Sequence, residues 1–355
     1  MQGKKYFIVG LKGTGKTALL RYISIKKEEE GNVKTSFVLF KSEIDEEYKK
    51  EFTQAARTTI AEDSGENVSH DDYEFIWRWF IYRKLVETME NDSTEIFQRN
   101  LIYNNFKALI NSPMDSSGNV KGSISLIPRI KKGNIIISKN PKFKLELEWD
   151  HEEKATISFN QLVRKADSEF SKLSAGEGSL DIFFDELELN HNTKKQYTRD
   201  ARLIRDIIVT ISKINATCKK KGFKILLYSA VRSEVQSAVD SLGKEINKVL
   251  GDFGTEIMWN RPGIDTSQQP LLNVVTKRLR TSLGKECESD SDTKIWELFF
   301  PEKIQNSETK SYILHHSWYR PRDIIRLLKI GQDQHPYESS FKHSVFDSIR
   351  KNIPN

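Results

Sequence analysis

Gly10-Leu11-Lys12-Gly13-Thr14-Gly15-Lys16-Thr17 is the stretch that decides the fold of this 355-residue chain. A glycine, four residues and then Gly-Lys-Thr form the pattern of a phosphate-binding loop. The preceding residues 5–10 have the character of a short buried strand, and the residues from Lys16 to about Ile25 that of a helix. Because the pattern functions between a strand and a helix, its position predicts a strand, a phosphate-binding loop and a helix in that order.

Each residue type in the loop suits the binding of ATP. Glycines allow positive φ, so successive backbone N–H groups can converge on phosphate oxygens, and the helix that follows adds its positive end. Lys16 is predicted to contact the β- and γ-phosphates, and the Thr17 hydroxyl to ligate Mg²⁺. The predicted cofactor-binding segment is Gly10, Leu11, Lys12, Gly13, Thr14, Gly15, Lys16, Thr17 and Ala18.

An apolar strand that ends in two acids lies in mid-sequence, Ile182-Phe183-Phe184-Asp185-Glu186. Strand ends in an open parallel sheet face the ligand crevice. Asp185 is predicted to hold Mg²⁺ through water. Glu186 is predicted to polarise the attacking water, which would make the chain an ATP hydrolase and not only an ATP binder. Asp181 precedes the apolar run, so we expect it at the opposite end of the strand.

Three further positions are predicted to sense the γ-phosphate. The apolar strand 223–231 carries Ser229 and leads into Arg232, for which a surface ion pair is an equally good interpretation. Near the C-terminus, Arg320-Pro321-Arg322-Asp323 opens an apolar-periodic helix, and proline suits a first helical turn. Arg322 on such a helical lid is predicted to reach back to the nucleotide, with an ordinary helix start as the alternative.

The order of strands and helices predicts an α/β P-loop NTPase fold, a parallel sheet with helices on both faces. The long separation between Lys16 and Asp185 requires a large α+β insertion. It includes an aromatic run at 75–82, interpreted as helix packing, and strand-like runs at 124–127, 135–137 and 143–149. A further strand is predicted at 256–259. The expected parts are 1–44 and 159–265 for the core, 45–158 for the insertion and 266–355 for a C-terminal helical lid.

Composition places the chain among ordinary soluble proteins, with 37% hydrophobic and 30% charged residues. No apolar run is long enough to span a bilayer, and the N-terminus lacks a signal peptide, so no membrane partner is expected. Cys218 and Cys287 form neither a disulfide framework nor a metal motif, which fits a cytoplasmic location.

The net charge of +6 is compatible with a nucleic-acid partner. The lysine runs Lys131-Lys132 and Lys219-Lys220-Lys221 are nevertheless interpreted as solvated loops, because no nucleic-acid motif accompanies them.

Taken in order, these motifs resemble the stand-alone bacterial P-loop ATPases related to the STAND and KAP groups of AAA-like ATPases. The resemblance covers most of the chain and implies an ATP-driven switch that self-associates or acts on a separate effector protein, often in signalling or antiviral defence against phage. The family's Walker lysine, magnesium threonine, acid pair and sensor arginine correspond to Lys16, Thr17, Asp185-Glu186 and Arg322. Relatives usually carry sequence before the loop, and no recognisable effector domain follows the lid here. The motifs that carry the resemblance are the loop, Phe183-Phe184-Asp185-Glu186-Leu187, Val231-Arg232-Ser233-Glu234-Val235, Met258-Trp259-Asn260 and Arg320-Pro321-Arg322-Asp323.

A DNA-engaging ATPase of the ABC or OLD type, partnered with a nuclease, is the main alternative. Leu173-Ser174-Ala175-Gly176-Glu177 resembles the ABC signature, but the short distance to Asp185 leaves no room for the helix that this family places between them. A small GTPase is disfavoured because Asn247-Lys248-Val249-Leu250 lacks the acid of the base-reading motif. A nucleotide or small-molecule kinase is disfavoured by Glu186 and by the lid motif.

We also considered an arginine supplied to a neighbouring subunit. Arg199, Arg202 and Arg205 on the helix after the acid pair are the candidates, with a solvated helix face as the expected role of most of them.

Overall fold

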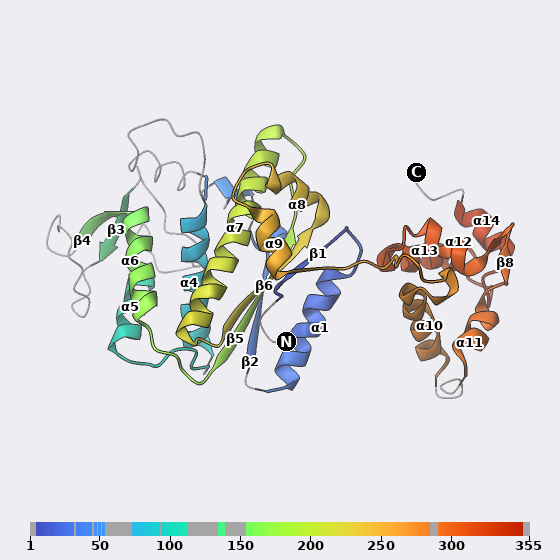
Figure 1. The fold of residues 1–355 in the computed structure, drawn as a ribbon, viewed down its shortest axis with the longest axis horizontal. Coiled ribbons are helices and arrows are strands. Elements are labelled where there is room, and N and C mark those ends of the chain that lie inside the picture. The colour runs from blue at the N-terminus through green and yellow to red at the C-terminus, as the bar shows by residue number, and fades with distance from the viewer. Residues whose placement is uncertain are drawn as a thin grey trace. The chain divides into compact units, whose positions relative to one another are not determined.

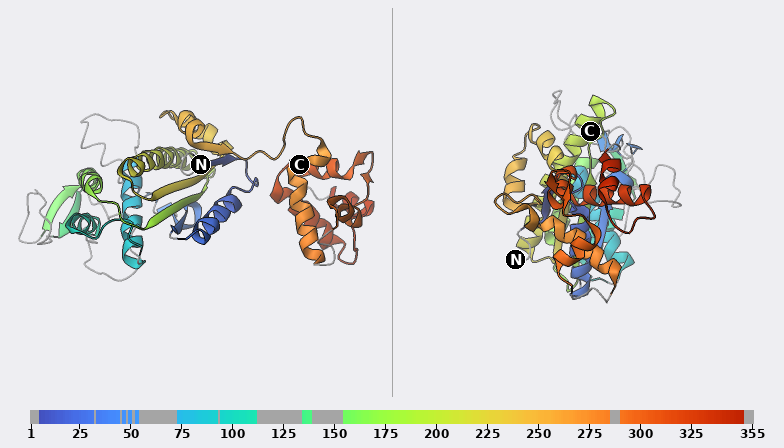
Figure 2. Two further views of the ribbon diagram at one scale, coloured as in Figure 1. Left: turned by 60° about the horizontal axis from the view of Figure 1, so that its bottom comes forward. Right: turned by 90° about the vertical axis from the view of Figure 1, so that its right-hand side faces the viewer.

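The computed structural model describes residues 5–31, 33–44, 46–47, 49–50, 52–53, 73–92, 94–111, 134–138, 154–284 and 290–350. The chain divides into two compact units, drawn as ribbons in Figures 1 and 2. The first unit comprises Met1–Val9 and Thr17–Thr255, and the second comprises Gly10–Lys16 and Glu256–Asn355. The second unit therefore begins before residue 266, the predicted start of the helical lid, and it includes the glycine loop.

A five-stranded sheet with the order β2-β5-β6-β1-β7 forms the centre of the fold. β2 pairs with β5, and β5 with β6, in parallel, so the carboxyl ends of these strands lie at one edge. β5 is buried on both faces, as expected for a central parallel strand. The strands are β1 Phe7–Gly10, β2 Val33–Leu39, β5 Ser179–Leu187, β6 Ile225–Arg232 and β7 Gly254–Glu256.

Helices flank this sheet, which confirms the predicted α/β class (Figure 1). The longest, α7, begins after Thr193, whose hydroxyl accepts a hydrogen bond from the Gln196 N–H, and ends at Gly222 in the left-handed conformation. The helices of the first unit are α1 Lys16–Glu29, α2 Phe40–Glu43, α4 Glu74–Asn91, α5 Leu101–Asn111, α6 Phe159–Lys172, α7 Lys194–Lys221, α8 Ser233–Asp240 and α9 Ile246–Phe253.

The predicted insertion between β2 and β5 is confirmed, since these strands pair directly from Val33↔Ser179 to Leu39↔Asp185. The helices α4, α5 and α6 and an antiparallel pair, β3 Asn134–Ser138 with β4 Lys154–Ser158, lie between them in sequence. β3 contains the predicted strand 135–137, whereas β4 was missed. The strands predicted at 124–127 and 143–149 lie outside the described residues.

The aromatic run on α4 packs inside the helical layer, as predicted. Trp77 and Trp79 are fully buried, and Trp77 lies edge-on to Phe52 and Phe80. The Trp77 indole donates a hydrogen bond to the Leu203 carbonyl of α7. These rings are therefore unable to act as an exposed platform for stacking bases.

Two predictions about local structure were wrong. The strand expected at 256–259 lies at Gly254–Glu256, where the chain pairs beside β1, and Trp259 instead packs against the core of the second unit. Lys219-Lys220-Lys221 forms the last turn of α7 and not a loop. Cations are favoured there because they interact with the negative end of the helix dipole. Lys131-Lys132 lies outside the described residues.

The C-terminal part of the second unit is helical, as predicted. Its core is an apolar cluster that includes Leu271, Trp296, Ile313, Ile324 and Phe346. Its elements are η1 Thr266–Gln268, α10 Pro270–Leu283, α11 Asp292–Phe299, the antiparallel pair β8 Lys303–Ile304 and β9 Ser307–Glu308, α12 Thr309–His316, α13 Pro321–Gln334 and α14 His343–Arg350.

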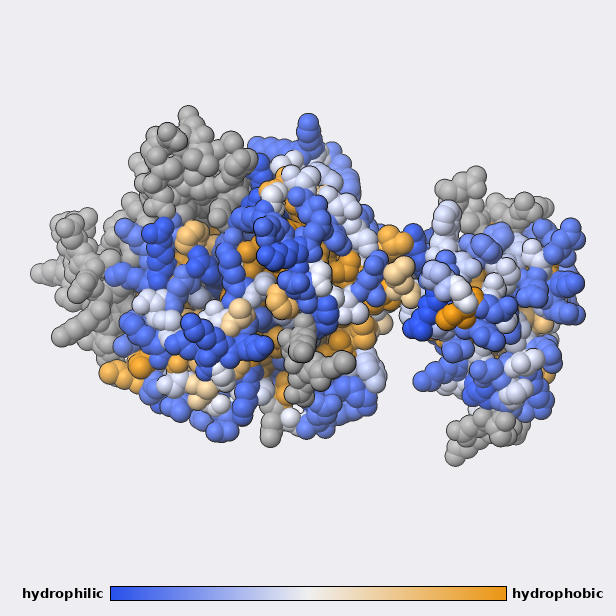
Figure 3. All heavy atoms as spheres, in the orientation of Figure 1, coloured by the Kyte–Doolittle hydropathy of each residue, from blue (hydrophilic) through white to orange (hydrophobic). Residues whose placement is uncertain are grey.

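The surface drawn in Figure 3 is mostly hydrophilic, with separate apolar patches. Within the described ranges, none of the helices combines the length and the apolar character needed to cross a bilayer. Cys218 is a free thiol buried in α7, and burial raises its pKa to about 12. Cys287 lies outside the described residues.

A fully buried acid, Asp206, joins α7 to α4. Its two carboxylate oxygens accept hydrogen bonds from Arg205 Nε at 2.7 Å and Nη2 at 2.9 Å, from Lys244 Nζ at 2.9 Å and from the Tyr73 N–H at 2.8 Å. Lys244 also contacts Glu74 on α4 at 2.7 Å. These contacts satisfy the hydrogen-bonding capacity of the carboxylate, which allows a charge to be buried.

Replacing Asp206 is expected to destabilise the first unit strongly. Asp206→Ala removes the carboxylate that pairs with the buried Arg205, and breaking a buried ion pair in this way typically costs about 3–5 kcal/mol. Thermal unfolding followed by circular dichroism checks this. Glu177→Ala is the control, because its fully exposed carboxylate pairs with Lys224 at the surface and should leave the midpoint unchanged. Equal midpoints for the two variants would contradict the assigned role of Asp206.

Candidate functional site

The glycine loop has the backbone geometry that its sequence predicted. β1 ends at Gly10 and α1 begins at Lys16, so the loop lies between a strand and a helix. Gly13 and Gly15 have φ of 88° and 94°, values that L side chains rarely adopt. At its start, the Thr14 hydroxyl donates a hydrogen bond to the Leu11 carbonyl at 2.9 Å. The positive end of α1 therefore follows a tightly wound, glycine-dependent loop.

Lys16 is buried inside this loop. Its ammonium donates hydrogen bonds to the carbonyl oxygens of Gly10 at 2.8 Å and Leu11 at 2.7 Å. These hydrogen bonds offset part of the free-energy cost of burying the ammonium charge, and they hold the ammonium group among the loop residues. Thr17 and Ala18, the next two residues of α1, are exposed.

The C-terminal helical part contacts the same loop within the second unit. The Arg322 N–H donates to the Gly13 carbonyl at 3.4 Å, and a Cβ atom added at Gly13 would lie 3.3 Å from Arg322 Nε and Nη2. The Trp259 indole donates to the Thr14 carbonyl at 2.8 Å. α13 begins at Pro321, as predicted, so Arg322 lies in its first turn. The predicted sensor arginine therefore lies against the loop, and Trp259 is a loop contact that sequence reasoning missed.

The predicted acid pair lies at the carboxyl end of β5. The pairing of β5 with β6 shifts register between Phe184 and Leu187, and Glu186 there has a φ of 58°. A non-glycine residue in this conformation at a strand irregularity is costly and re-aims the side chain. The Glu186 carboxylate accepts a hydrogen bond from the Ser42 hydroxyl at 2.8 Å, a partner with no sequence signal.

Asp185 is buried with one carboxylate oxygen unused. Its Oδ1 accepts a hydrogen bond from the Glu186 N–H at 2.8 Å, whereas its Oδ2 has no hydrogen-bond partner. On the neighbouring strand β6, the fully buried Ser229 hydroxyl also lacks a partner, as does the Ser233 hydroxyl directly after that strand. Buried polar atoms are normally satisfied, so three such oxygens near one sheet edge indicate a place prepared for further polar groups.

Arg232, the second sensor candidate of β6, forms ion pairs with Glu188 and, at 3.7 Å, with Glu234. Lys41 contacts the same Glu188 at 3.5 Å. The position of Arg232 is compatible with both interpretations made from the sequence, a γ-phosphate sensor and a surface ion pair, because it lies at the end of β6 that also carries Ser229. Among the described residues, no group of three His, Cys, Asp or Glu could hold a metal by itself.

The arginines of α7 are engaged inside the unit and do not form a solvated face. Arg205 is buried against Asp206. Arg199 contacts both Glu46 and Asp200 at 2.8 Å. The hydrogen bond from Arg199 to Glu46 lowers the pKa of the Glu46 carboxyl to about 2. Arg202, the third candidate for an arginine supplied in trans, is partly buried. The expectation of a solvated helix face was therefore wrong for Arg205, because an acid on the same helix pairs with it.

The segment that resembles an ABC signature has a structural role at the other end of β5. α6 ends at Lys172 and β5 begins at Ser179, so no helix separates this segment from the acid strand. The Gly176 N–H donates to the Ile96 carbonyl at 2.9 Å, and a Cβ added at Gly176 would lie 2.1 Å from the Glu95 carbonyl oxygen. Close packing against the backbone of Glu95 explains why position 176 is a glycine. This structural role argues against interpreting the segment as an ABC signature.

Asp181 lies near the start of β5, away from the acid pair, as predicted. It is buried, its Oδ2 has no hydrogen-bond partner, and the nearest cation is Lys27 at 4.0 Å. Burial raises the pKa of this carboxyl from its usual value of 3.8 to about 6, against a smaller opposing effect of Lys27. Asp181 also lines a cavity of about 1220 Å³ together with Lys5, Lys219, Lys220 and Lys224.

The raised pKa of Asp181 predicts pH-dependent stability. Between pH 3.8 and 6 the folded state holds this proton more tightly than the unfolded state, so the contribution of Asp181 to stability falls as pH rises through this range. Asp181→Asn is therefore expected to stabilise the protein at pH 7.5 by about 1–3 kcal/mol, with the gain disappearing towards pH 4. Thermal midpoints at both pH values test this. Asp252→Asn, an exposed acid of the same cavity, is the control, and an equal gain in both variants would contradict it.

Comparison with known protein families finds a match for one part of the chain. Residues 269–340 match the family of FunZ-associated C-terminal helical domains. None of the curated proteins matches the chain. The matched residues run from the start of α10 to just before α14, and they include α13 and Arg322.

Proposed function

We propose that this protein is a Mg²⁺-dependent ATP hydrolase in which nucleotide binding controls the C-terminal helical part. The observation that carries the proposal is the loop between β1 and α1, where Gly13 and Gly15 take positive φ and Lys16 is buried among the loop residues. Such a loop presents backbone N–H groups, a helix N-terminus and a lysine to a triphosphate.

The strand order supports one site within the first unit for Thr17, Ser229 and the acid pair. β6 lies between β1 and β5, and Val9 and Thr17, on either side of the loop, both belong to the first unit. Ligands in open α/β sheets bind outside the carboxyl ends of the strands. In this proposal Glu186 orients and polarises the attacking water, and Ser229 on the intervening strand hydrogen-bonds the γ-phosphate.

The residues present fit a magnesium ion bound together with ATP. Asp185 Oδ2 is a buried carboxylate oxygen without a hydrogen-bond partner, and the Thr17 hydroxyl is exposed on the first turn of α1. Magnesium prefers one or two protein oxygens with water and phosphate oxygens as its other ligands. Asp185, through water, and Thr17 would hold the ion, which would neutralise charge on the β- and γ-phosphates when bound.

In the proposed switch, Arg322 connects helix α13 to the bound nucleotide. Its guanidinium lies beside Gly13, so an added γ-phosphate would attract it and draw the first turn of α13 with it. We therefore propose an ATP-driven switch related to the STAND and KAP groups, which acts through self-association or a separate effector protein. The conformation of the C-terminal helical part would then depend on whether a γ-phosphate is bound.

Two substitutions test the hydrolase assignment. Lys16→Ala is expected to abolish measurable ATP binding and hydrolysis, because it removes the cation that faces the phosphates. Glu186→Gln is expected to lower kcat by about 10²–10⁴-fold while retaining ATP binding, since it removes the general base. Fluorescent-ATP binding and phosphate release measure the two effects. Wild-type hydrolysis in either variant would refute the assignment, and Asp181→Asn, which lies at the other strand end, should hydrolyse ATP normally.

A third variant tests the sensor role. Arg322→Ala should lower kcat about tenfold or more, because a charge-assisted contact to the γ-phosphate is lost, while ADP affinity should stay unchanged. Arg326→Ala, an exposed arginine one turn further along α13, is the matched control and should resemble the wild type. Equal kcat values for the two variants would remove Arg322 from the mechanism.

A nucleic-acid-engaging ATPase is the second candidate. The observation that favours it is the cavity of about 1220 Å³ in which five lysines, Lys5, Lys27, Lys219, Lys220 and Lys224, outnumber the three acids Glu30, Asp181 and Asp252. Stimulation of ATP hydrolysis by DNA, with a steep decrease as salt increases, would favour this candidate over a switch acting on a protein effector.

A further inference from the structure

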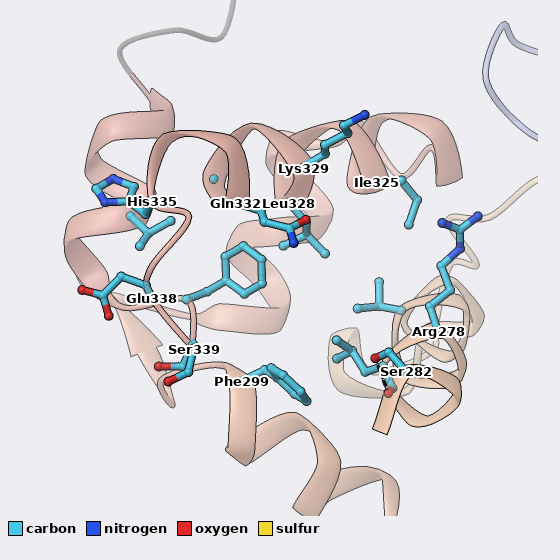
Figure 4. A pocket seen from close by; sticks show the side chains of 16 residues that line it. Arg278, Ser282, Phe299, Ile325, Leu328, Lys329, Gln332, His335, Glu338 and Ser339 are labelled. Atoms are coloured by element: carbon cyan, nitrogen blue, oxygen red, sulfur yellow. Dashed lines mark hydrogen bonds between the residues drawn. The ribbon is translucent and has the colours of Figure 1, made fainter. Parts of the chain in front are cut away.

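A second hollow lies in the C-terminal helical part, away from the residues assigned to ATP. It has a volume of about 470 Å³ and is bounded by α10, the end of α11, α13 and the segment that leads into α14 (Figure 4). Volumes of this size are typical of small-molecule sites. The hollow lies almost wholly within residues 269–340, the matched helical domain.

The wall of this hollow is apolar. Leu279, Phe299, Leu328 and Phe341 pack against the helical core but are only partly buried by it, and all four line the hollow. Figure 4 shows Phe299 and Leu328 on opposite sides of it. Apolar surface left in a concave site is stabilised by an apolar ligand, because binding removes it from water.

The rim of the hollow is cationic. Arg278 on α10 and Lys329 on α13 are exposed, and neither has an ion-pair partner among the described residues. Glu338, the acid that lines the hollow, is paired with Lys342 at 2.5 Å. In Figure 4, Arg278 extends from α10 towards Ile325 on α13. The uncompensated charge at the opening is therefore positive, which complements an anion.

We propose that this hollow binds a small amphiphilic acid, with its acyl or aromatic body against the apolar wall and its carboxylate or phosphate at Arg278. Guanidinium groups bind carboxylates and phosphates with paired hydrogen bonds, so Arg278 sets the charge preference. A cationic or neutral ligand of the same shape gains only the apolar contacts.

The ligand would act on the proposed ATPase through α13. This helix carries Arg322, which contacts the glycine loop, in its first turn, and Ile325, Leu328 and Lys329, which line the hollow, one to two turns later. A ligand that favours one position of α13 shifts the contact of Arg322 with Gly13 by the same free energy. This coupling rests on the proposed function, whereas ligand binding itself does not.

Calorimetric titration of the full chain, without nucleotide, tests the site. The probes are decanoate and indole-3-acetate, which represent an acyl and an aromatic acid, and decylamine and decan-1-ol are the charge controls. We expect at least one acid to bind, and both controls to bind at least tenfold more weakly than that acid. Failure of both acids, or equal affinity of acid and alcohol, would overturn the proposal.

Variants locate the binding to this hollow. Arg278→Ala should weaken binding of the acid about tenfold, and Ser282→Trp, at an exposed lining position of α10, should fill the opening and abolish it. Lys277→Ala, an exposed lysine next to Arg278 that does not line the hollow, is the control and should bind normally. Unchanged affinity in Arg278→Ala and Ser282→Trp would overturn the proposal, and an unchanged thermal midpoint shows that both variants fold.

Hydrolysis of ATP with and without the bound acid then tests the coupling. A change in kcat that disappears in Arg278→Ala supports it, and binding without any change in kcat overturns the coupling while leaving the site intact. If the wild type hydrolyses no ATP, the proposed function fails, but the titration still decides whether the site exists.

Discussion

The parallel pairing of β5 with β2 on one side and β6 on the other is the constraint on which the first unit depends. A strand in this position is covered on both faces, so Leu180, Ile182, Phe183 and Phe184 are all buried and polar residues are confined towards its two ends. Asp181 lies near one end and Asp185 with Glu186 at the other. The same pairing brings the carboxyl end of β6, with Ser229, beside the acid pair.

The carboxyl edge of the sheet combines buried polar atoms that lack hydrogen-bond partners with an unfavourable backbone conformation. Asp185 and Ser229 keep buried oxygens without partners, and Glu186 adopts a conformation that is unfavourable for a glutamate. At Asp206 a buried charge is instead compensated by four hydrogen-bond donors, whereas Asp181 at the other end of β5 also has a buried oxygen without a hydrogen-bond partner. Unsatisfied polar atoms and strained backbone both reduce stability, and their occurrence together at Asp185 and Glu186 supports the ligand site proposed there.

The glycine loop connects β1 to α1 and also contacts residues near and in the C-terminal helical part. Its ends continue into β1 and α1, and within the second unit it contacts Arg322 at Gly13 and Trp259 at Thr14. A phosphate bound by such a loop would change the electrostatic environment of Arg322 directly. The helix α13 that carries this arginine also forms one wall of the apolar hollow, so the proposed nucleotide site and the proposed acid site share a single rigid element.

The sequence by itself determined the strand–loop–helix, the acid strand, the insertion and the start of α13, because these depend on local periodicity, glycine and proline conformation and residue chemistry. The tertiary structure alone decided the strand order, the irregularity at Glu186, the Ser42 and Trp259 contacts and the ion pairs of Arg199, Arg205 and Asp206. Each of these joins residues far apart in the chain or depends on how completely a side chain is buried. Sequence periodicity carries neither kind of information, which is why a solvated face was expected for most of the arginines of α7, whereas Arg205 is held in the core.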